Sequence, residues 1–100
     1  ICDPCHGNTY TTKNGYKTRN IQDIKSEIKT FFEIHKEMNS FVGGIHLENT
    51  GQKVTECVGG NVKSEEDLSK NYKSKCDPRL NREQSIEIAL YVSKLLKMYQ

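Results

Sequence analysis

The sequence predicts an α/β fold in which a short strand and a helix alternate three times. Apolar residues recur at helical spacing between residues 21 and 38 and again between residues 81 and 99. Short apolar segments bounded by glycine or other turn residues precede the helical stretches. This alternation favours parallel β/α units with helices on the outside of the sheet, although three units alone neither close a sheet nor cover both of its faces.

Length and composition predict one small domain, residues 1–100, with a thin core. Only 34% of the 100 residues are hydrophobic, and a chain of this size buries about two thirds of its unfolded surface. The 15 Lys and Arg are interspersed with 13 Asp and Glu, which disfavours a basic face for nucleic acid. No apolar run approaches the roughly 20 residues that span a membrane. We therefore expect neither nucleic acid nor a membrane as a partner.

The first forty residues are predicted to contain a strand, a turn and a helix. Residues 1–5 resemble a strand that runs into a loop, and residues 8–19 are polar, with an Asn-Gly turn signal at 14–15. A helix begins at Ile21, because Asn20 is a favourable N-cap. Its predicted apolar stripe comprises Ile21, Ile24, Ile28, Phe31, Phe32, His35 and Met38.

The middle of the chain is predicted to hold two extended segments and a short helix. Residues 45–48 alternate apolar and polar after a double glycine, and residues 54–58 form a second extended segment. Ser64 and Asp67 have the spacing of a capping box, which opens a short helix to about Tyr72.

The last predicted helix begins after Asn81. Gln84 stands three residues later and completes a capping-box pattern. The predicted apolar stripe of this helix comprises Ile86, Ala89, Leu90, Leu95, Leu96 and Tyr99.

Four cysteines, Cys2, Cys5, Cys57 and Cys76, allow several interpretations. A disulfide scaffold normally needs about 8–10% cysteine in a short chain. A structural zinc site needs a second closely spaced pair of ligands, and a redox Cys-x-x-Cys needs a helix after its first cysteine. The simplest interpretation is that the four are small, buried, reduced thiols.

Three potential metal ligands are expected at the carboxyl ends of the three predicted strands. They are His6, Glu48 and Asp77. Chemistry in parallel β/α folds is located at this edge, and an imidazole with two carboxylates suits a divalent cation such as Mn, Fe, Co or Zn. The alternative is that the two acids only form turns or helix caps. His46 shares a strand face with Glu48, where it either orients that carboxylate or packs as filler.

Five ordered motifs give the chain a resemblance to a known family. They are Cys2-Asp3-Pro4-Cys5-His6-Gly7-Asn8-Thr9, Gly15-Tyr16-Lys17-Thr18-Arg19, Gly43-Gly44-Ile45-His46-Leu47-Glu48-Asn49-Thr50-Gly51, Val54-Thr55-Glu56-Cys57-Val58-Gly59-Gly60 and Cys76-Asp77-Pro78-Arg79-Leu80-Asn81. Together they resemble the C-terminal part of class II 3-deoxy-D-arabino-heptulosonate 7-phosphate (DAHP) synthase. The resemblance implies a (β/α)8 TIM barrel, of which this chain would be the last three β/α units.

The resemblance also implies an activity and a cofactor. The family condenses phosphoenolpyruvate with erythrose 4-phosphate, releasing phosphate, as the entry step of the shikimate pathway. Its divalent metal, often Mn2+ with Co2+, Fe2+ or Zn2+ as alternatives, is held by His, Glu and Asp residues that match His6, Glu48 and Asp77. The fourth ligand, a cysteine on an early strand, has no counterpart among the four cysteines here.

The resemblance implies that most substrate contacts come from earlier parts of the barrel, which this chain does not include. Lys17, Arg19 and Arg79 are the basic residues near predicted strand ends, where they either contact a substrate phosphate or serve as loop charges and salt bridges. Cys5 replaces a common Met of the family, and residues 39–42 replace its Gly-Thr-His-Pro run.

Two functions follow as expectations. The chain is either part of a working synthase or a stand-alone degenerate fragment that binds a metal or a partner without catalysis. For the synthase we expect a homo-oligomer at full length, located in the cytoplasm of a bacterium or in a plastid of a plant or alga. The isolated hundred residues are expected to be inactive.

Overall fold

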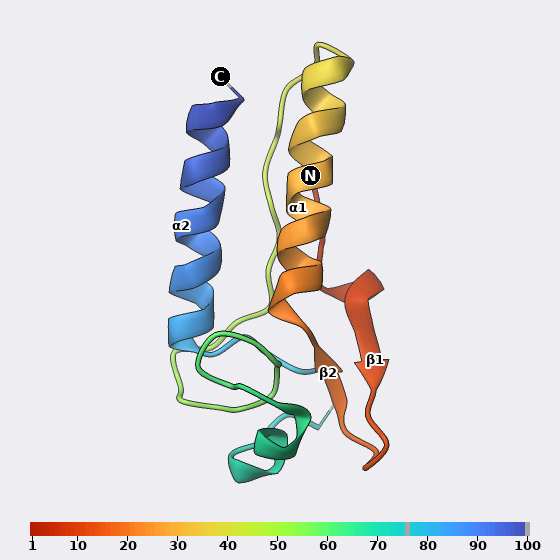
Figure 1. The fold of residues 1–100 in the computed structure, drawn as a ribbon, viewed down its shortest axis with the longest axis vertical. Coiled ribbons are helices and arrows are strands. Elements are labelled where there is room, and N and C mark those ends of the chain that lie inside the picture. The colour runs from red at the N-terminus through yellow and green to blue at the C-terminus, as the bar shows by residue number, and fades with distance from the viewer. Residues whose placement is uncertain (76, 100) are drawn as a thin grey trace.

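The computed structural model describes residues 1–75 and 77–99. Two helices, α1 (Ile21–Glu37) and α2 (Arg82–Met98), lie side by side and form one half of an elongated molecule measuring 43 × 21 × 19 Å (Figure 1). The other half holds a hairpin of strands β1 (Thr9–Thr11) and β2 (Lys17–Arg19) together with long loops. Two 3-10 helices, η1 (His6–Asn8) and η2 (Glu65–Lys70), complete the elements. No helix among the described residues has the length and apolar character needed to cross a membrane.

Helix α1 confirms the prediction over most of its length. The Asn20 side chain accepts a hydrogen bond from the backbone N–H of Gln22 at 2.8 Å, so the predicted N-cap is formed. The buried face comprises Ile21, Ile24, Ile28 and Phe32. Met38 does not belong to this face: the helix ends at Glu37, and the Met38 side chain is 73% exposed.

Helix α2 begins as predicted but buries a different face. The Asn81 and Gln84 side chains form both hydrogen bonds of a capping box. The buried helical residues are Gln84, Ile88 and Leu95, whereas Ile86 and Leu90 are 50% and 67% exposed. At 3.6 residues per turn, a residue two positions from Ile88 points about 160° away from it. The prediction of Ile86 and Leu90 as core residues is therefore wrong, because α1 contacts the side of α2 that carries Ile88. Ala89 and Leu96 of the predicted stripe are exposed as well, whereas Leu95 is buried as predicted.

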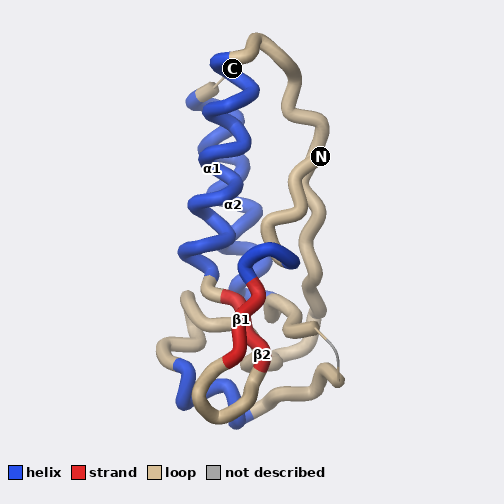
Figure 2. The backbone as a smooth tube through the Cα atoms, turned by 90° about the vertical axis from the view of Figure 1, so that its right-hand side faces the viewer, coloured by secondary structure: helices blue, strands red, loops and turns tan. Residues whose placement is uncertain are grey.

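The three predicted strands are replaced by single parallel bridges. Cys2 pairs with Ile45, and Asn49 pairs with Leu80. The segment that follows α1 therefore runs back beside the N-terminal segment (Figure 2). Val58 pairs with Asn20 in the same parallel sense. The parallel direction agrees with the predicted α/β units, but in the described residues no pairing extends far enough to make a parallel strand.

The observed sheet is an antiparallel hairpin within a region predicted to be turn-rich loop. Thr9 pairs with Arg19, Tyr10 with Thr18 and Thr11 with Lys17. The connection passes through Gly15, whose φ of 87° lies in the left-handed region that glycine adopts without strain. The Asn-Gly signal therefore marked a hairpin connection, and β2 carries Arg19 into the interior.

The short helix predicted from Ser64 is shorter and tighter than expected. It forms η2, a 3-10 helix that ends at Lys70. Ser64 Oγ lies 3.5 Å from Asp67 Oδ2 and makes no side-chain hydrogen bond to the helix backbone, so the predicted backbone cap is absent at this position.

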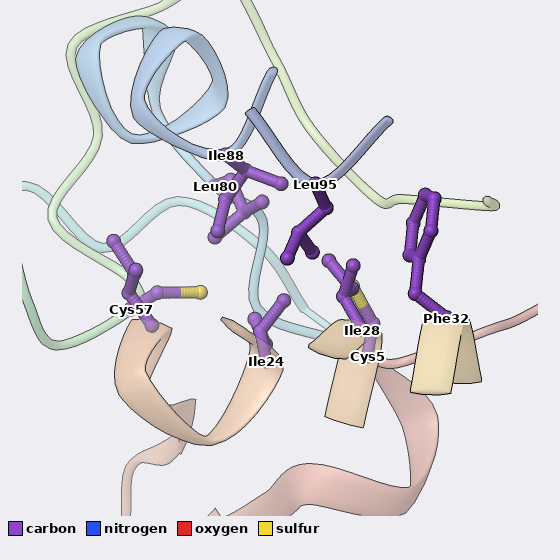
Figure 3. Packing of buried hydrophobic residues seen from close by; sticks show 9 residues of the cluster. Cys5, Ile24, Ile28, Phe32, Cys57, Leu80, Ile88 and Leu95 are labelled. Carbon is purple, nitrogen blue, oxygen red and sulfur yellow. The ribbon is translucent and has the colours of Figure 1, made fainter. Parts of the chain in front are cut away.

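The main core lies between the two long helices and the loops beside them. Apolar side chains of α1 face Leu80, Ile88 and Leu95, and two cysteines fill the space among them (Figure 3). Cys2, Cys5 and Cys57 are free, buried thiols, as predicted, whereas Cys76 lies outside the described residues. Burial raises the pKa of Cys57 to about 12, so this thiol stays protonated at neutral pH.

Candidate metal centre

The loop before η1 orients His6 through Asp3. Asp3 Oδ1 accepts hydrogen bonds from the backbone N–H groups of Cys5 at 3.1 Å and His6 at 3.3 Å. Asp3 Oδ2 lies 2.6 Å from His6 Nδ1, so the ring is held with Nε2 free. Partial burial alone would raise the pKa of the Asp3 carboxyl, but the hydrogen bonds from His6 and Cys5 outweigh it and lower this pKa below its usual value. The Asp3 carboxylate therefore fixes the orientation of the His6 imidazole.

The structure brings together the three residues predicted as metal ligands. His6 Nε2 lies 3.1 Å from Glu48 Oε1 and 3.9 Å from Asp77 Oδ2. One ligand atom from each residue can be chosen so that all three lie within 4.8 Å of one another. His6 and Glu48 follow segments joined by the Cys2 bridge, whereas Asp77 lies in a loop before Leu80 rather than after a strand.

Arg19 enters this cluster from the buried side. Its side chain is 1% exposed, and Nε donates to Thr9 Oγ1 while Nη1 donates to the carbonyl oxygen of Pro78, both at 2.8 Å. Nη2 lies 2.9 Å from Glu48 Oε1, an ion pair whose two atoms are not aligned as a hydrogen bond. Arg19 thus joins the hairpin, the Glu48 segment and the Asp77 loop.

The donor set fits a divalent cation. Glu48 Oε1 is a buried carboxylate oxygen without an aligned hydrogen bond, and it faces an imidazole nitrogen. This oxygen already forms an ion pair with the Arg19 guanidinium at 2.9 Å, so the case for a cation rests on the donor set. One nitrogen and two carboxylates suit metals of the borderline class, and a carboxylate on the far side of the histidine is the usual support for such a ligand.

The remaining predicted site residues occupy different surroundings. Arg79 is exposed and, with Lys73 and Lys75, lines a cavity of about 420 Å³ that also reaches Glu48 and Asp77. Lys17 is exposed at the start of β2 and does not line this cavity. His46 is exposed, and within the described part of the chain its side chain makes no hydrogen bond, although its backbone N–H donates to Cys2.

Asp3 and Glu56 contribute to this region but are not among the predicted site residues. Asp3 could have been recognised from its position three residues before His6 in a turn. For Arg19 the sequence predicts either a phosphate contact or a salt bridge; the structure shows the salt bridge, to Glu48, and this pair depends on the hairpin. Glu56 was not singled out; its signal is an acid in the centre of the apolar segment 54–58, and its side chain is 1% exposed.

Comparison with known proteins identifies the family. The model of the "Class-II DAHP synthetase family" matches residues 1–93. The chain belongs to this family. The resemblance carried by the five motifs is thereby confirmed, and the histidine, glutamate and aspartate cluster of the structure lies within the matched region.

Curated relatives of this DAHP synthetase family member carry one printed name, "Phospho-2-dehydro-3-deoxyheptonate aldolase". The protein from Streptomyces coelicolor is 49% identical over 98 residues, which is 97% of this chain and 22% of that protein. The protein from Neurospora crassa is 54% identical over 93 residues, or 92% of this chain and 19% of that protein. A Streptomyces lividans protein is 48% identical over 98 residues, 67% of its length. The chain thus spans about a fifth of the first two relatives.

Proposed function

We propose that this chain is the metal-binding part of a DAHP synthase. The complete protein would condense phosphoenolpyruvate with erythrose 4-phosphate and water, releasing DAHP and inorganic phosphate. The observation that carries the proposal is the convergence of His6, Glu48 and Asp77 within 4.8 Å in a chain of this family. The names of the relatives support the same reaction.

The proposed cofactor is a divalent metal ion, with Mn2+ as the first choice and Co2+, Fe2+ and Zn2+ as alternatives. His6 Nε2 and carboxylate oxygens of Glu48 and Asp77 would hold it. When bound, the ion supplies Lewis-acid polarisation of the aldehyde oxygen of erythrose 4-phosphate. The described cysteines do not belong to the cluster, so we assign no thiolate ligand to them.

The side chains around the cluster prepare it for this role. Asp3 holds the His6 ring through Nδ1, which leaves Nε2 as the free nitrogen. Arg19 holds the Glu48 carboxylate and adds positive charge at the buried side. The cavity is lined by three basic residues, Lys73, Lys75 and Arg79, and by three acids, Glu48, Glu56 and Asp77. Its basic residues suit a substrate that carries a phosphate group.

We further propose that the chain contributes the last three β/α units of a (β/α)8 barrel. The parallel bridges Cys2–Ile45 and Asn49–Leu80 would mark neighbouring barrel strands that gain length when the remaining strands are present. The exposed Ile86 and Leu90 on α2 support this, because apolar side chains on a second helix face need a partner surface. A barrel of this type typically takes about 250 residues.

The decisive experiment measures phosphate release from phosphoenolpyruvate and erythrose 4-phosphate. We expect turnover by the complete protein with Mn2+, loss of turnover after chelation with EDTA, and recovery on adding Mn2+ back. The isolated hundred residues should show no turnover. A folded, Mn2+-loaded complete protein that releases no phosphate would contradict the proposal, and turnover by the isolated chain would contradict the assignment of the substrate contacts to other segments.

Arg79 is the proposed phosphate contact within this chain. Its side chain lines the cavity beside Glu48 and Asp77, whereas Lys17 lies outside the cavity and the Arg19 guanidinium is occupied by protein oxygens. We expect Arg79→Ala in the complete protein to raise the KM of one substrate roughly 10-fold, the loss of about one charged hydrogen bond. Lys17→Ala is the matched control, with both KM values unchanged. Unchanged KM values in Arg79→Ala would exclude this role.

A further inference from the structure

Glu56 is a buried acid whose carboxylate binds one loop of the backbone. Its side chain is 1% exposed. Oε2 accepts hydrogen bonds from the backbone N–H groups of Lys73 at 3.0 Å and Ser74 at 2.9 Å, and Oε1 accepts one from the N–H of Arg79 at 2.8 Å. Hydrogen bonds to an ionised acceptor are roughly twice as strong as neutral ones. The three hydrogen bonds therefore tie the backbone at residues 73, 74 and 79 to a single side chain.

These hydrogen bonds lie on both sides of Asp77. On its carboxyl side the loop is also held by the Leu80 N–H, which donates to the Glu48 carbonyl oxygen at 3.0 Å, and by Arg19 through Pro78. On its amino side, Lys73 and Ser74 bind the Glu56 carboxylate, and the described part of the loop has no helix or strand. Among the described residues, Glu56 thus holds the backbone on both sides of Asp77.

Glu56 is itself anchored to the hairpin that carries Arg19. Thr18 Oγ1 donates to the Glu56 carbonyl oxygen at 2.8 Å, and the Val58 N–H donates to the Arg19 carbonyl oxygen at 2.8 Å. Thr18 and Arg19, adjacent residues of β2, are thus connected to both Glu56 and Glu48. Thr18 fixes the backbone of Glu56, and the Arg19 side chain contacts Glu48.

We propose that Glu56 is a positioning residue of the metal centre, which holds the backbone at residues 73–74 and at Arg79 so that the Asp77 carboxylate faces His6 and Glu48. Glu56 lies outside the candidate ligand cluster of the described residues and acts through the backbone of the loop. The inference rests on the proposed function, because it takes Asp77 as a ligand.

The test compares Mn2+ affinity in the complete protein, measured from the electron paramagnetic resonance signal of free Mn2+. Glu56→Gln keeps the side-chain size but replaces one acceptor oxygen with an NH2 group, which donates and cannot accept a hydrogen bond from the loop. We expect Mn2+ binding to weaken 10- to 100-fold, the range typical of a residue that orients a ligand. We also expect kcat to recover at saturating Mn2+. Glu66→Gln, at an exposed position of η2, is the matched control with wild-type affinity.

A double-mutant cycle separates positioning from general stability. If Glu56 acts through Asp77, Glu56→Gln has no further effect on Mn2+ affinity in the Asp77→Asn background. The same fold-loss in both backgrounds would overturn the proposal. Glu56→Asp is the second variant for the case that Glu56→Gln does not fold: it keeps the charge but is too short to reach both sides of the loop, so weaker Mn2+ binding is again expected.

The outcomes also separate this inference from the proposed function. Unchanged Mn2+ affinity in the Asp77→Asn protein would contradict both the proposed metal centre and the proposed role of Glu56. A large loss in Asp77→Asn with wild-type affinity in a folded Glu56→Gln or Glu56→Asp protein would overturn the role of Glu56 alone.

Discussion

Glu48→Gln is expected to weaken Mn2+ binding by more than about 100-fold, beyond the 10- to 100-fold typical of residues that only orient a ligand. Glu48 Oε1 lies closest to the free nitrogen of His6, at 3.1 Å, and the side chain is 25% exposed. Glutamine has nearly the same size but lacks the negative charge that attracts the cation. Titration of the complete protein with Mn2+ measures the effect.

Glu83→Gln is a matched control for Glu48→Gln. Glu83 is an exposed acid in the first turn of α2 and lies outside the candidate ligand cluster of the described residues. The Mn2+ affinity of the Glu83→Gln protein should equal that of the unaltered protein. Wild-type affinity in a folded Glu48→Gln protein would show that the cluster does not bind the metal through this carboxylate.

Arg19→Met is expected to cause the largest loss of stability, about 3 kcal/mol in the free energy of unfolding. Removal of one partner from a buried ion pair typically costs about 3–5 kcal/mol, and the partial exposure of Glu48 places the value at the lower end. Methionine fills the space of the aliphatic stem but cannot donate to Thr9, to the Pro78 carbonyl or to Glu48. Urea unfolding of the complete protein measures the change.

Two further variants define the role of Arg19. Arg19→Lys keeps the charge but not the planar fork, so it should recover part of the lost stability. Lys17→Met, at an exposed position of the same strand, should alter the free energy of unfolding by less than about 0.5 kcal/mol. An Arg19→Met protein as stable as the unaltered one would mean that the contacts of the guanidinium contribute nothing net to folding.

Most of the helical structure could be predicted because its signals are local. The Asn20 cap and the Asn81–Gln84 capping box each satisfy backbone groups within four residues of themselves. The buried face of α2 was less predictable, since both Ile86 and Ile88 are apolar and only the position of α1 decides between them. Strands were predicted poorly for the same reason, because the partner of Cys2 is Ile45, more than forty residues away.

The family motifs predicted the grouping of His6, Glu48 and Asp77, and the positions of His6 and Glu48 after short apolar segments agreed with it. Tertiary structure alone decided which residues support them. Arg19 and Glu48 are 29 positions apart, and Glu56 reaches backbone groups 17 to 23 positions away. Local sequence determines caps, turns and the types of side chain that can bind a metal. Long-range hydrogen bonds and ion pairs depend on how the hairpin, helices and loops pack, and they decide where those side chains point.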